Sequence, residues 1–259
     1  MFLRYVALGD SQTEGVGDGD DTTGLRGWAD RLAETVARSS PELRYANLAV
    51  RGRLAGQVRA EQLGPALALA PDLATVVAGV NDLLRPRFDA DEVGGHLAAM
   101  FAALTATGTR VVTVAAPDLT RLIPAARPLA PRITALNAAV REAARPHGVT
   151  VVEIDRHPAS TDPRLWSTDR LHASSLGHTL IAAAFAEALA LPGADDSWTR
   201  PLPPAAVRPP SGVRALTAEA AWVAGFLGPW IGRRLRGRSS GDGRTAKRPE
   251  PAPVTAARE

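Results

Sequence analysis

Short apolar segments alternate with longer segments of helical periodicity along the first 191 residues. The apolar runs are continuous rather than alternating with polar residues, which is typical of strands buried on both faces of a sheet. The Ala- and Leu-rich segments between them have the spacing of amphipathic helices. The predicted strands cover residues 2–8, 43–49, 73–78, 110–115 and 150–154, and the predicted helices cover 27–38, 54–69, 89–107, 130–145 and 174–191.

This alternation predicts a single α/β domain over residues 1–191. Each strand must return to the same sheet through a crossover helix, so the five strands are expected to be parallel, with helices on both faces. In such sheets the ligand crevice lies beyond the carboxyl ends of the strands. Polar residues that directly follow a strand are therefore the first candidates for chemistry.

The composition changes after residue 191. Pro192 to Pro210 is rich in proline and is expected to be a linker, residues 192–216. Residues 217–236 regain apolar residues and are expected to form a short amphipathic helix, and residues 237–259 are expected to be a disordered basic tail. Together these three parts form a C-terminal extension to the α/β domain.

Trp222, Phe226 and Trp230 are four residues apart and would share one face of the 217–236 helix. We expect this face to dock onto the α/β domain. The alternative is peripheral membrane contact, because aromatic residues beside a basic end suit anionic lipid surfaces. The following run at 233–238 is interpreted as a solvated basic end.

Charge and cysteine content restrict the function further. Residues 192–259 hold 11 of the 30 Lys and Arg but only 6 of the 27 Asp and Glu, so the positive excess lies in the extension, and a nucleic-acid-binding face on the domain is not expected. The absence of cysteine excludes disulfides and thiolate chemistry. The first apolar run is too short for a signal peptide, and cleavage at the usual distance would remove Ser11, so a cytoplasmic protein is expected.

Four polar motifs follow strands or precede the last helix, and the topology would gather them at one sheet edge. Their sequences are GDSQTEG at residues 9–15, NLAVRG at 47–52, GVND at 79–82 and STDRLH at 167–172. A serine hydroxyl needs an adjacent base to attack a carbonyl, and His172 has a suitable pKa for that role. Asp169 lies three residues before His172 and could orient the imidazole and stabilise its charged form. Ser11, His172 and Asp169 are therefore the candidate nucleophile, base and orienting acid.

The four motifs, in this order, resemble those of the SGNH or GDSL-type hydrolase family. The resemblance rests on Ser11, Gly52, Asn81 and the Asp169-x-x-His172 pair, and it covers residues 1 to about 191. It implies a flavodoxin-like three-layer α/β/α sandwich and hydrolysis of small-molecule acyl esters through an acyl-serine intermediate. It also implies an oxyanion hole made by the backbone N–H groups of Ser11 and Gly52 and the side-chain amide of Asn81. Gln12 departs from the family, in which an apolar residue is common at this position.

Two other functions stay open at this point. Asp10, Asp82, Asp169 and His172 have the right ligand types for a divalent metal, which would suit a metal-dependent phosphoesterase. The chain could also be a non-catalytic module that binds a ligand in an inherited site.

No cofactor is expected, since the sequence lacks a complete dinucleotide or P-loop motif, and it also lacks the Gly-x-Ser-x-Gly elbow of another hydrolase fold. Asp10 and Asp82 are expected to support the site through hydrogen bonds, and His178 is expected to be a structural histidine.

Overall fold

A six-stranded sheet forms the centre of the molecule. The computed structural model describes residues 1–118, 120, 122–204, 217, 220–227 and 239–254. The strand order is β7-β6-β5-β1-β4-β8, and every pair is parallel except β4 with β8. The strands are β1 (Arg4–Gly9), β4 (Arg44–Asn47), β5 (Leu73–Val77), β6 (Arg110–Val114), β7 (Thr150–Val152) and β8 (Arg248–Pro253), and β2 (Gly19–Asp20) pairs with β3 (Gly24–Leu25) in a small separate hairpin.

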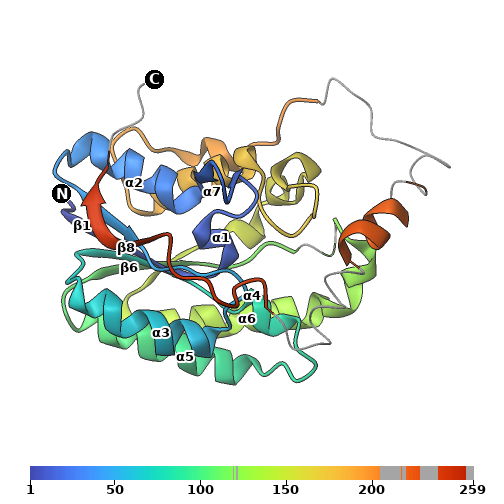
Figure 1. Ribbon diagram of the computed structural model, residues 1–259, viewed down its shortest axis with the longest axis horizontal. Coiled ribbons are helices and arrows are strands. Elements are labelled where there is room, and N and C mark those ends of the chain that lie inside the picture. Colours follow the sequence, from blue (N-terminus) through green and yellow to red (C-terminus); the bar gives the residue numbers. More distant parts are fainter. Residues whose placement is uncertain (119, 121, 205–216, 218–219, 228–238, 255–259) are drawn as a thin grey trace.

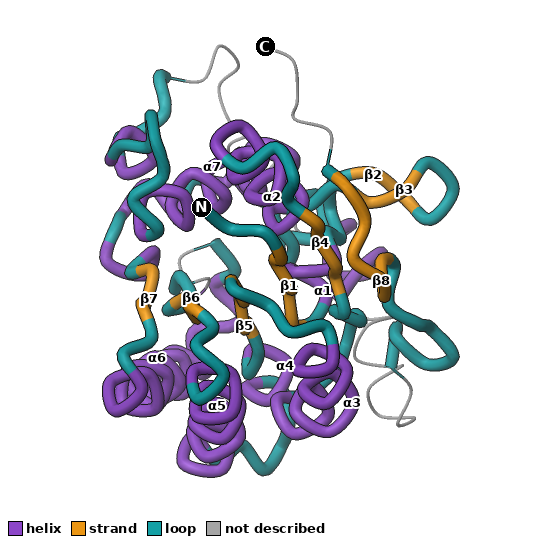
Figure 2. Tube along the Cα trace, turned by 90° about the vertical axis from the view of Figure 1, so that its left-hand side faces the viewer, coloured by secondary structure: helices purple, strands orange, loops and turns teal. Residues whose placement is uncertain are grey.

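Helices cover both faces of this sheet, which gives the expected flavodoxin-like three-layer sandwich (Figures 1 and 2). One layer contains α2 and α7, and the other contains α3, α5 and α6. The α-helices are α1 (Ser11–Glu14), α2 (Trp28–Ser39), α3 (Ala55–Ala68), α4 (Val80–Leu83), α5 (Ala90–Thr105), α6 (Ala130–Ala144) and α7 (Ser175–Ala188). Short 3-10 helices lie at Pro124–Leu129, Arg145–His147, Ile154–Arg156, Pro158–Thr161, Pro163–Leu165 and Asp196–Thr199.

The central strand β1 divides its side chains between two apolar cores. Val6 and Leu8 pack with residues of α3, α5 and α6, whereas Tyr5 and Ala7 pack with residues of α2 and α7. Successive side chains of a strand point to opposite faces, so a continuous apolar run is required to cover both layers. The five parallel strands and five long helices predicted from periodicity are confirmed.

The strand order places the polar motifs at one position. β1 pairs with β4 on one side and with β5 on the other, so the chain changes direction across the sheet between β1 and β5. Ser11 follows β1 and Asn81 follows β5. Both residues therefore lie at the switch point of an open α/β sheet, where ligands bind.

The expected disorder of residues 237–259 is wrong for residues 239–254. Arg248–Pro253 form β8, which adds to the sheet edge antiparallel to β4, with Arg44 opposite Pro253 and Tyr45 opposite Ala252. Three prolines alternate along this strand, and successive residues direct their N–H groups to opposite sides. The prolines therefore remove donors from one side only, which an edge strand tolerates. The prolines of this segment therefore did not indicate disorder, because their alternate spacing is compatible with an edge strand.

The described part of the 217–236 segment docks onto the domain at Trp222. The Arg170 guanidinium lies 4.6 Å from the centre of the Trp222 ring, and Trp222 is buried. Its described residues are helical at 217 and 220–222 and continue into a π-helix at Val223–Leu227. Trp230 and the basic run at 233–238 lie outside the described residues, as do most of the predicted linker and the end of the predicted tail. Among the described residues, no helix has the length and apolar character needed to cross a bilayer.

Candidate active site

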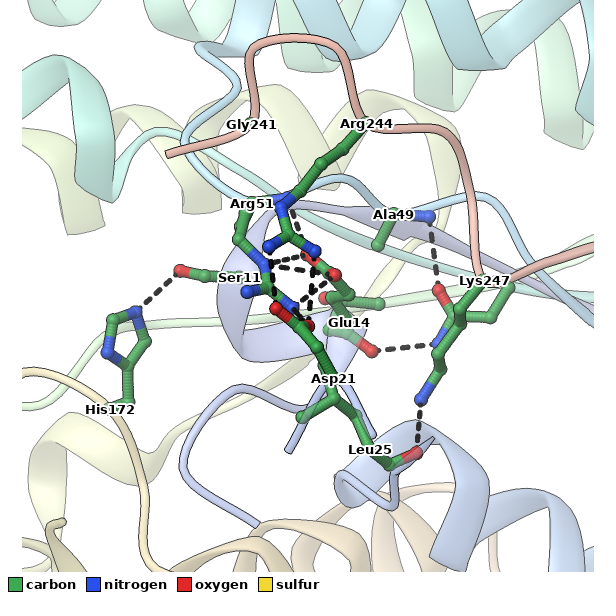
Figure 3. Close-up of polar contacts among 12 residues, drawn as sticks. Ser11, Glu14, Asp21, Leu25, Ala49, Arg51, His172, Gly241, Arg244 and Lys247 are labelled. Atoms are coloured by element: carbon green, nitrogen blue, oxygen red, sulfur yellow. Dashed lines mark hydrogen bonds and ion pairs between the residues drawn. The ribbon is translucent and has the colours of Figure 1, made fainter. Parts of the chain in front are cut away.

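Ser11, His172 and Asp169 form one hydrogen-bonded chain, although 161 residues separate the serine from the histidine. The Ser11 Oγ lies 2.9 Å from the Nε2 of His172, and the Nδ1 of His172 lies 2.6 Å from the Oδ2 of Asp169 (Figure 3 shows the first contact). This is the order of contacts that lets an imidazole accept the serine proton while a carboxylate stabilises the resulting charge.

The loop that carries His172 is held by contacts within itself. Asp169 Oδ1 accepts hydrogen bonds from the backbone N–H groups of Leu171 and His172 and from the Ser167 hydroxyl, at 2.9, 3.0 and 2.6 Å. Burial would raise the pKa of Asp169, but the hydrogen bonds from His172 and Ser167 outweigh it and hold that pKa below its ordinary value. Asp169 is therefore ionised at neutral pH and fixes the imidazole orientation.

Gln12 reaches across to the same loop and contacts both neighbours of His172. Its Nε2 donates to the Leu171 carbonyl at 2.8 Å, and its Oε1 accepts from the Ala173 N–H at 3.3 Å. The amide thus bridges the backbone on either side of the base, and this role was missed in the sequence. The sequence contained one indication of this role: Gln12 is polar at a position where an apolar residue is common in the SGNH or GDSL-type family.

The loop that follows β4, residues 47–53, carries Gly52, an expected oxyanion donor, and is called the oxyanion loop below after that expectation. Gly52 adopts a φ of +79°, which favours glycine, and a Cβ there would lie 2.2 Å from the Ser239 hydroxyl. Glycine at this position would also let the backbone approach a substrate closely. The structure adds a second reason, which is the closeness of the C-terminal segment.

Asn81 links the residues beside the other two candidate oxyanion donors. Its Nδ2 donates to Asp10 Oδ2 at 2.9 Å and to the Arg53 carbonyl at 3.1 Å. Asp10 precedes Ser11 in the sequence, and Arg53 follows Gly52. The Asn81 side chain therefore hydrogen-bonds a sequence neighbour of each of the other two candidate donors. Donation from Asn81 to a substrate oxygen requires one of these two hydrogen bonds to be released.

Asp10 and Asp82 both lie beside the site and have perturbed acidity. Burial raises the pKa of Asp10 to about 6, against hydrogen bonds from the Gln12 N–H and the Asn81 side chain that lower it. Burial also raises the pKa of Asp82, whose Oδ2 accepts from the Ala55 N–H at 3.0 Å and so fixes the start of α3 beside the oxyanion loop.

His178 is fully buried and makes its hydrogen bonds to residues outside the Ser11–His172–Asp169 chain. Its Nδ1 accepts from the Trp28 N–H at 3.1 Å and its Nε2 faces the Val16 carbonyl at 3.2 Å. Burial lowers the pKa of His178 to about 4, so the ring is neutral and its Nε2–H donates to Val16. His178 thus joins α7 to the start of α2.

The four side chains of the alternative metal site, Asp10, Asp82, Asp169 and His172, do not form a common ligand cluster in this structure. Within the ranges that the structure describes, no group of three or more such side chains converges on a point that a metal could occupy. Asp10 faces Asn81, Asp82 faces the start of α3, and Asp169 faces the imidazole. The carboxylates are used as hydrogen-bond acceptors for separate parts of the site.

An apolar cavity of about 120 Å³ lies between the carboxyl ends of the strands and the α2 and α7 layer. Its lining includes Gln12, Val80 and Ala173, which adjoin Ser11, Asn81 and His172 in the sequence. Most of the remaining wall comes from strand ends and from the α2 and α7 layer, including Val77, Val114, Ile154, Trp28, Ile181 and Phe185. Such a cavity suits an apolar group attached to the reacting carbonyl.

The sequence between residues 7 and 180 matches the family model described as the GDSL-like lipase/acylhydrolase family. No curated protein matches the chain by sequence. The fold is similar to that of LAE5, an alpha/beta hydrolase enzyme from the metagenome of Lake Arreo, with 22% identity, a TM-score of 0.62, and 73% of this chain and 95% of that chain covered.

It is also similar to a variant of Axe2, an acetyl xylan esterase from Geobacillus stearothermophilus, with 17% identity, a TM-score of 0.59 and coverage of 73% and 95%. A third similar structure is the psychrotrophic esterase EstA from Pseudoalteromonas sp., with 15% identity, a TM-score of 0.58 and coverage of 73% and 97%. At these identities the likeness concerns the fold.

Proposed function

The chain belongs to the GDSL-like lipase/acylhydrolase family and is a hydrolase acting on ester bonds, and we propose that it cleaves carboxylic esters through an acyl-serine intermediate. The observation that carries the proposal is the continuous hydrogen-bonded chain from Ser11 Oγ through His172 to Asp169. His172 accepts the Ser11 proton as the oxygen attacks the carbonyl carbon, and it then donates that proton to the departing alkoxide. A water molecule attacks the acyl-serine in the second half-reaction, with His172 again as base.

The tetrahedral intermediate is stabilised in this proposal by Ser11, Gly52 and Asn81. The three donors lie on segments that follow β1, β4 and β5: Ser11 begins α1, Gly52 lies in the loop after β4, and Asn81 lies in α4. Their cluster is supported by the hydrogen bonds of Asn81 to Asp10 and Arg53. Preorganised donors of this kind each contribute about 10²- to 10³-fold in rate.

The apolar cavity indicates the substrate class, which we propose to be esters with an apolar acyl chain. A cavity of about 120 Å³ is close in size to an engineered one of roughly 150 Å³ that binds benzene. An acyl chain of about six carbons therefore fits it better than an acetyl group does. Each buried methylene contributes ~0.8 kcal/mol, so the four additional methylenes of hexanoate should raise kcat/KM roughly 200-fold above that for acetate if all of them are buried.

The test combines a nucleophile variant with a panel of p-nitrophenyl esters from acetate to decanoate. Ser11→Ala should abolish turnover of every ester, and wild-type Ser11 should be labelled by an organophosphonate. Equal turnover in wild type and Ser11→Ala would reject the mechanism. Failure of the folded wild type to be labelled would instead favour a module that only binds a ligand.

A cavity-filling variant separates the acyl proposal from the mechanism. Val114 lies at the end of β6 and lines the cavity, so Val114→Phe should lower hexanoate turnover more than acetate turnover. Val223→Phe is the matched control, since Val223 is 41% exposed and lies outside the cavity lining. Equal losses for both esters in Val114→Phe would refute the acyl assignment and leave the triad proposal intact.

A further inference from the structure

The C-terminal segment, residues 239–254, runs along the oxyanion loop. Its strand β8 pairs with β4, and β4 ends at Asn47, where the loop begins. Two arginines reinforce this pairing. The Arg44 guanidinium donates to the Pro251 carbonyl at 3.1 Å, and the Arg248 guanidinium lies 5.3 Å from the centre of the Tyr45 ring. The segment is thus fixed beside the strand that delivers Gly52.

The turn before β8 packs directly on the loop backbone. A Cβ on Gly241 would lie 2.0 Å from the Arg51 carbonyl oxygen, and a Cβ on Gly52 would lie 2.2 Å from the Ser239 hydroxyl. Each glycine therefore permits the other segment to approach, and the Ser239 hydroxyl also points to the Gly52 carbonyl at 3.5 Å. The turn is ordered by its own hydrogen bonds, including Ser239 N–H to Asp242 Oδ2 at 2.8 Å.

A chain of alternating charges joins the same turn to the helix of the nucleophile (Figure 3). Arg244 donates to both oxygens of Asp21 at 3.1 and 2.6 Å, and Asp21 also accepts from Arg51 at 2.9 Å. Arg51 in turn pairs with Glu14 at 2.8 Å, and its backbone N–H donates to Glu14 at 2.7 Å. Glu14 ends α1, the helix that begins at Ser11.

The two ends of this chain of charges differ in solvent exposure. Arg51 and Glu14 are 13% and 6% exposed, so this pair is screened little by water. Asp21 and Arg244 are 52% and 39% exposed, so their pairing alone adds little to folding stability. Removing Arg244 should therefore alter the orientation of Arg51 without unfolding the domain.

Lys247 fixes the middle of the segment at another point. Its Nζ donates to Asp30 at 2.6 Å and to the Leu25 carbonyl at 3.0 Å. Asp30 also accepts from the Gly27 N–H at the start of α2. The segment therefore contacts three parts of the domain: the sheet edge at β4, the oxyanion loop, and the small hairpin with the start of α2.

From these contacts, and resting on the proposed function, we propose that residues 239–254 position the oxyanion loop for catalysis. Arg244 and Gly241 are positioning residues, which act on the Gly52 N–H through Arg51. Oxyanion donors must lie at 2.7–3.1 Å from the developing charge, so a small displacement of the loop reduces the rate of the chemical step. Among the described residues, the apolar cavity is lined by none from 47–53 or 239–254, so ground-state binding should be unaffected.

The experiment uses the full-length chain with Arg244→Ala, Arg244→Lys and Gly241→Ala. We expect Arg244→Ala to lower kcat about 5- to 20-fold with KM within twofold, and Arg244→Lys to restore most of it. Gly241→Ala should lower kcat more, since its Cβ presses on the Arg51 carbonyl. Arg200→Ala is the matched arginine control, because Arg200 makes an exposed pair with Asp196. Gly64→Ala is the glycine control, because a Cβ there meets nothing within 4 Å.

Hydrogen exchange of residues 47–53, measured without substrate, provides a readout independent of activity. Faster exchange in Arg244→Ala and Gly241→Ala than in the controls, at unchanged melting temperature, supports the proposal. Unchanged kcat and unchanged exchange in both variants would overturn it, and so would an effect on KM alone. A wild type that neither hydrolyses esters nor reacts at Ser11 would defeat the proposed function, whereas the exchange result would still decide whether the segment positions the loop.

Discussion

The two loops that contact α1, the loop of His172 and the oxyanion loop, are held in different ways. The loop of His172 is fixed by neighbours in sequence, since Asp169 accepts hydrogen bonds from residues within three positions of itself. The oxyanion loop has a local contact of this kind, from the Ala49 N–H to Asn47 Oδ1, but its Arg51 and Gly52 contact distant residues: Glu14, Asp21 and the C-terminal turn at residues 239–244.

This difference predicts different responses to substitution. A locally held loop keeps its shape when remote residues change, so damage to it comes from its own side chains. A loop held by remote contacts can be displaced by changes far from the reacting atoms. The two loops also meet through α1, because Gln12 contacts the first and Glu14 contacts the second.

The largest effect is expected from Asp169→Asn in the locally held loop. The amide cannot stabilise a charged imidazole and favours the wrong tautomer, so kcat should fall about 10³- to 10⁴-fold. Steady-state kinetics with p-nitrophenyl hexanoate measures this, and circular dichroism verifies the fold. A loss below tenfold would show that Asp169 is not the orienting acid.

The next largest effect is expected from Gly52→Ala in the oxyanion loop. The new Cβ meets Ser239 and the backbone φ of +79° becomes strained, so the Gly52 N–H moves and kcat should fall about 10²-fold. Ser239→Gly removes the contact but not the backbone strain. If the double variant Gly52→Ala/Ser239→Gly recovers only part of kcat, the loss that remains is due to backbone strain. If it recovers kcat fully, the whole loss in Gly52→Ala is due to the contact with Ser239.

A smaller effect is expected from Gln12→Leu, which introduces the kind of residue common at this position in the family. The loop of His172 retains its internal hydrogen bonds but loses the bridge to Leu171 and Ala173, so kcat should fall roughly 10-fold. Gln12→Glu keeps one acceptor and serves as the comparison. An unchanged kcat in Gln12→Leu would mean that local contacts alone position the base.

The smallest effect on activity, and a distinct effect on stability, is expected from Asp10→Asn. The folded pKa of Asp10 is about 6, above its ordinary value of 3.8, so ionisation destabilises the folded state as pH rises between these values. At pH 8 the variant should therefore gain about 2–3 kcal/mol relative to wild type, and at pH 3 the gain should vanish. Urea denaturation at both pH values measures the difference, and an equal gain at each pH would contradict this reasoning.

Much of the fold could be predicted because the strands are buried on both faces. The runs at 4–9 and 73–77 had to be continuous and apolar to cover two helical layers, and this pattern is visible in one dimension. Helix α7 likewise begins after Ser174, whose side chain accepts from the Gly177 N–H as an N-cap. These features depend on local periodicity and local hydrogen bonds, which neighbouring residues specify.

The role of the C-terminal segment could not be predicted in the same way. Its prolines and charges are also typical of disordered tails, and its order depends on a partner strand some 200 residues earlier. Arg51 similarly stands in a recognisable motif, but its partners Glu14 and Asp21 follow no fixed spacing from it. Long-range ion pairs leave no periodic pattern in a sequence.

The sequence by itself therefore determined the α/β class, the strand-end positions of the polar motifs, and the pairing of Asp169 with His172. Periodicity, strand-end position and short spacing are local properties, so they can be read along the chain. Only the tertiary structure decided that the Gln12 amide bridges the loop of His172 and that residues 239–254 cover the sheet edge beside Gly52. These contacts form between segments that meet only after the sheet has assembled, because chain topology and close packing, not sequence distance, bring them together.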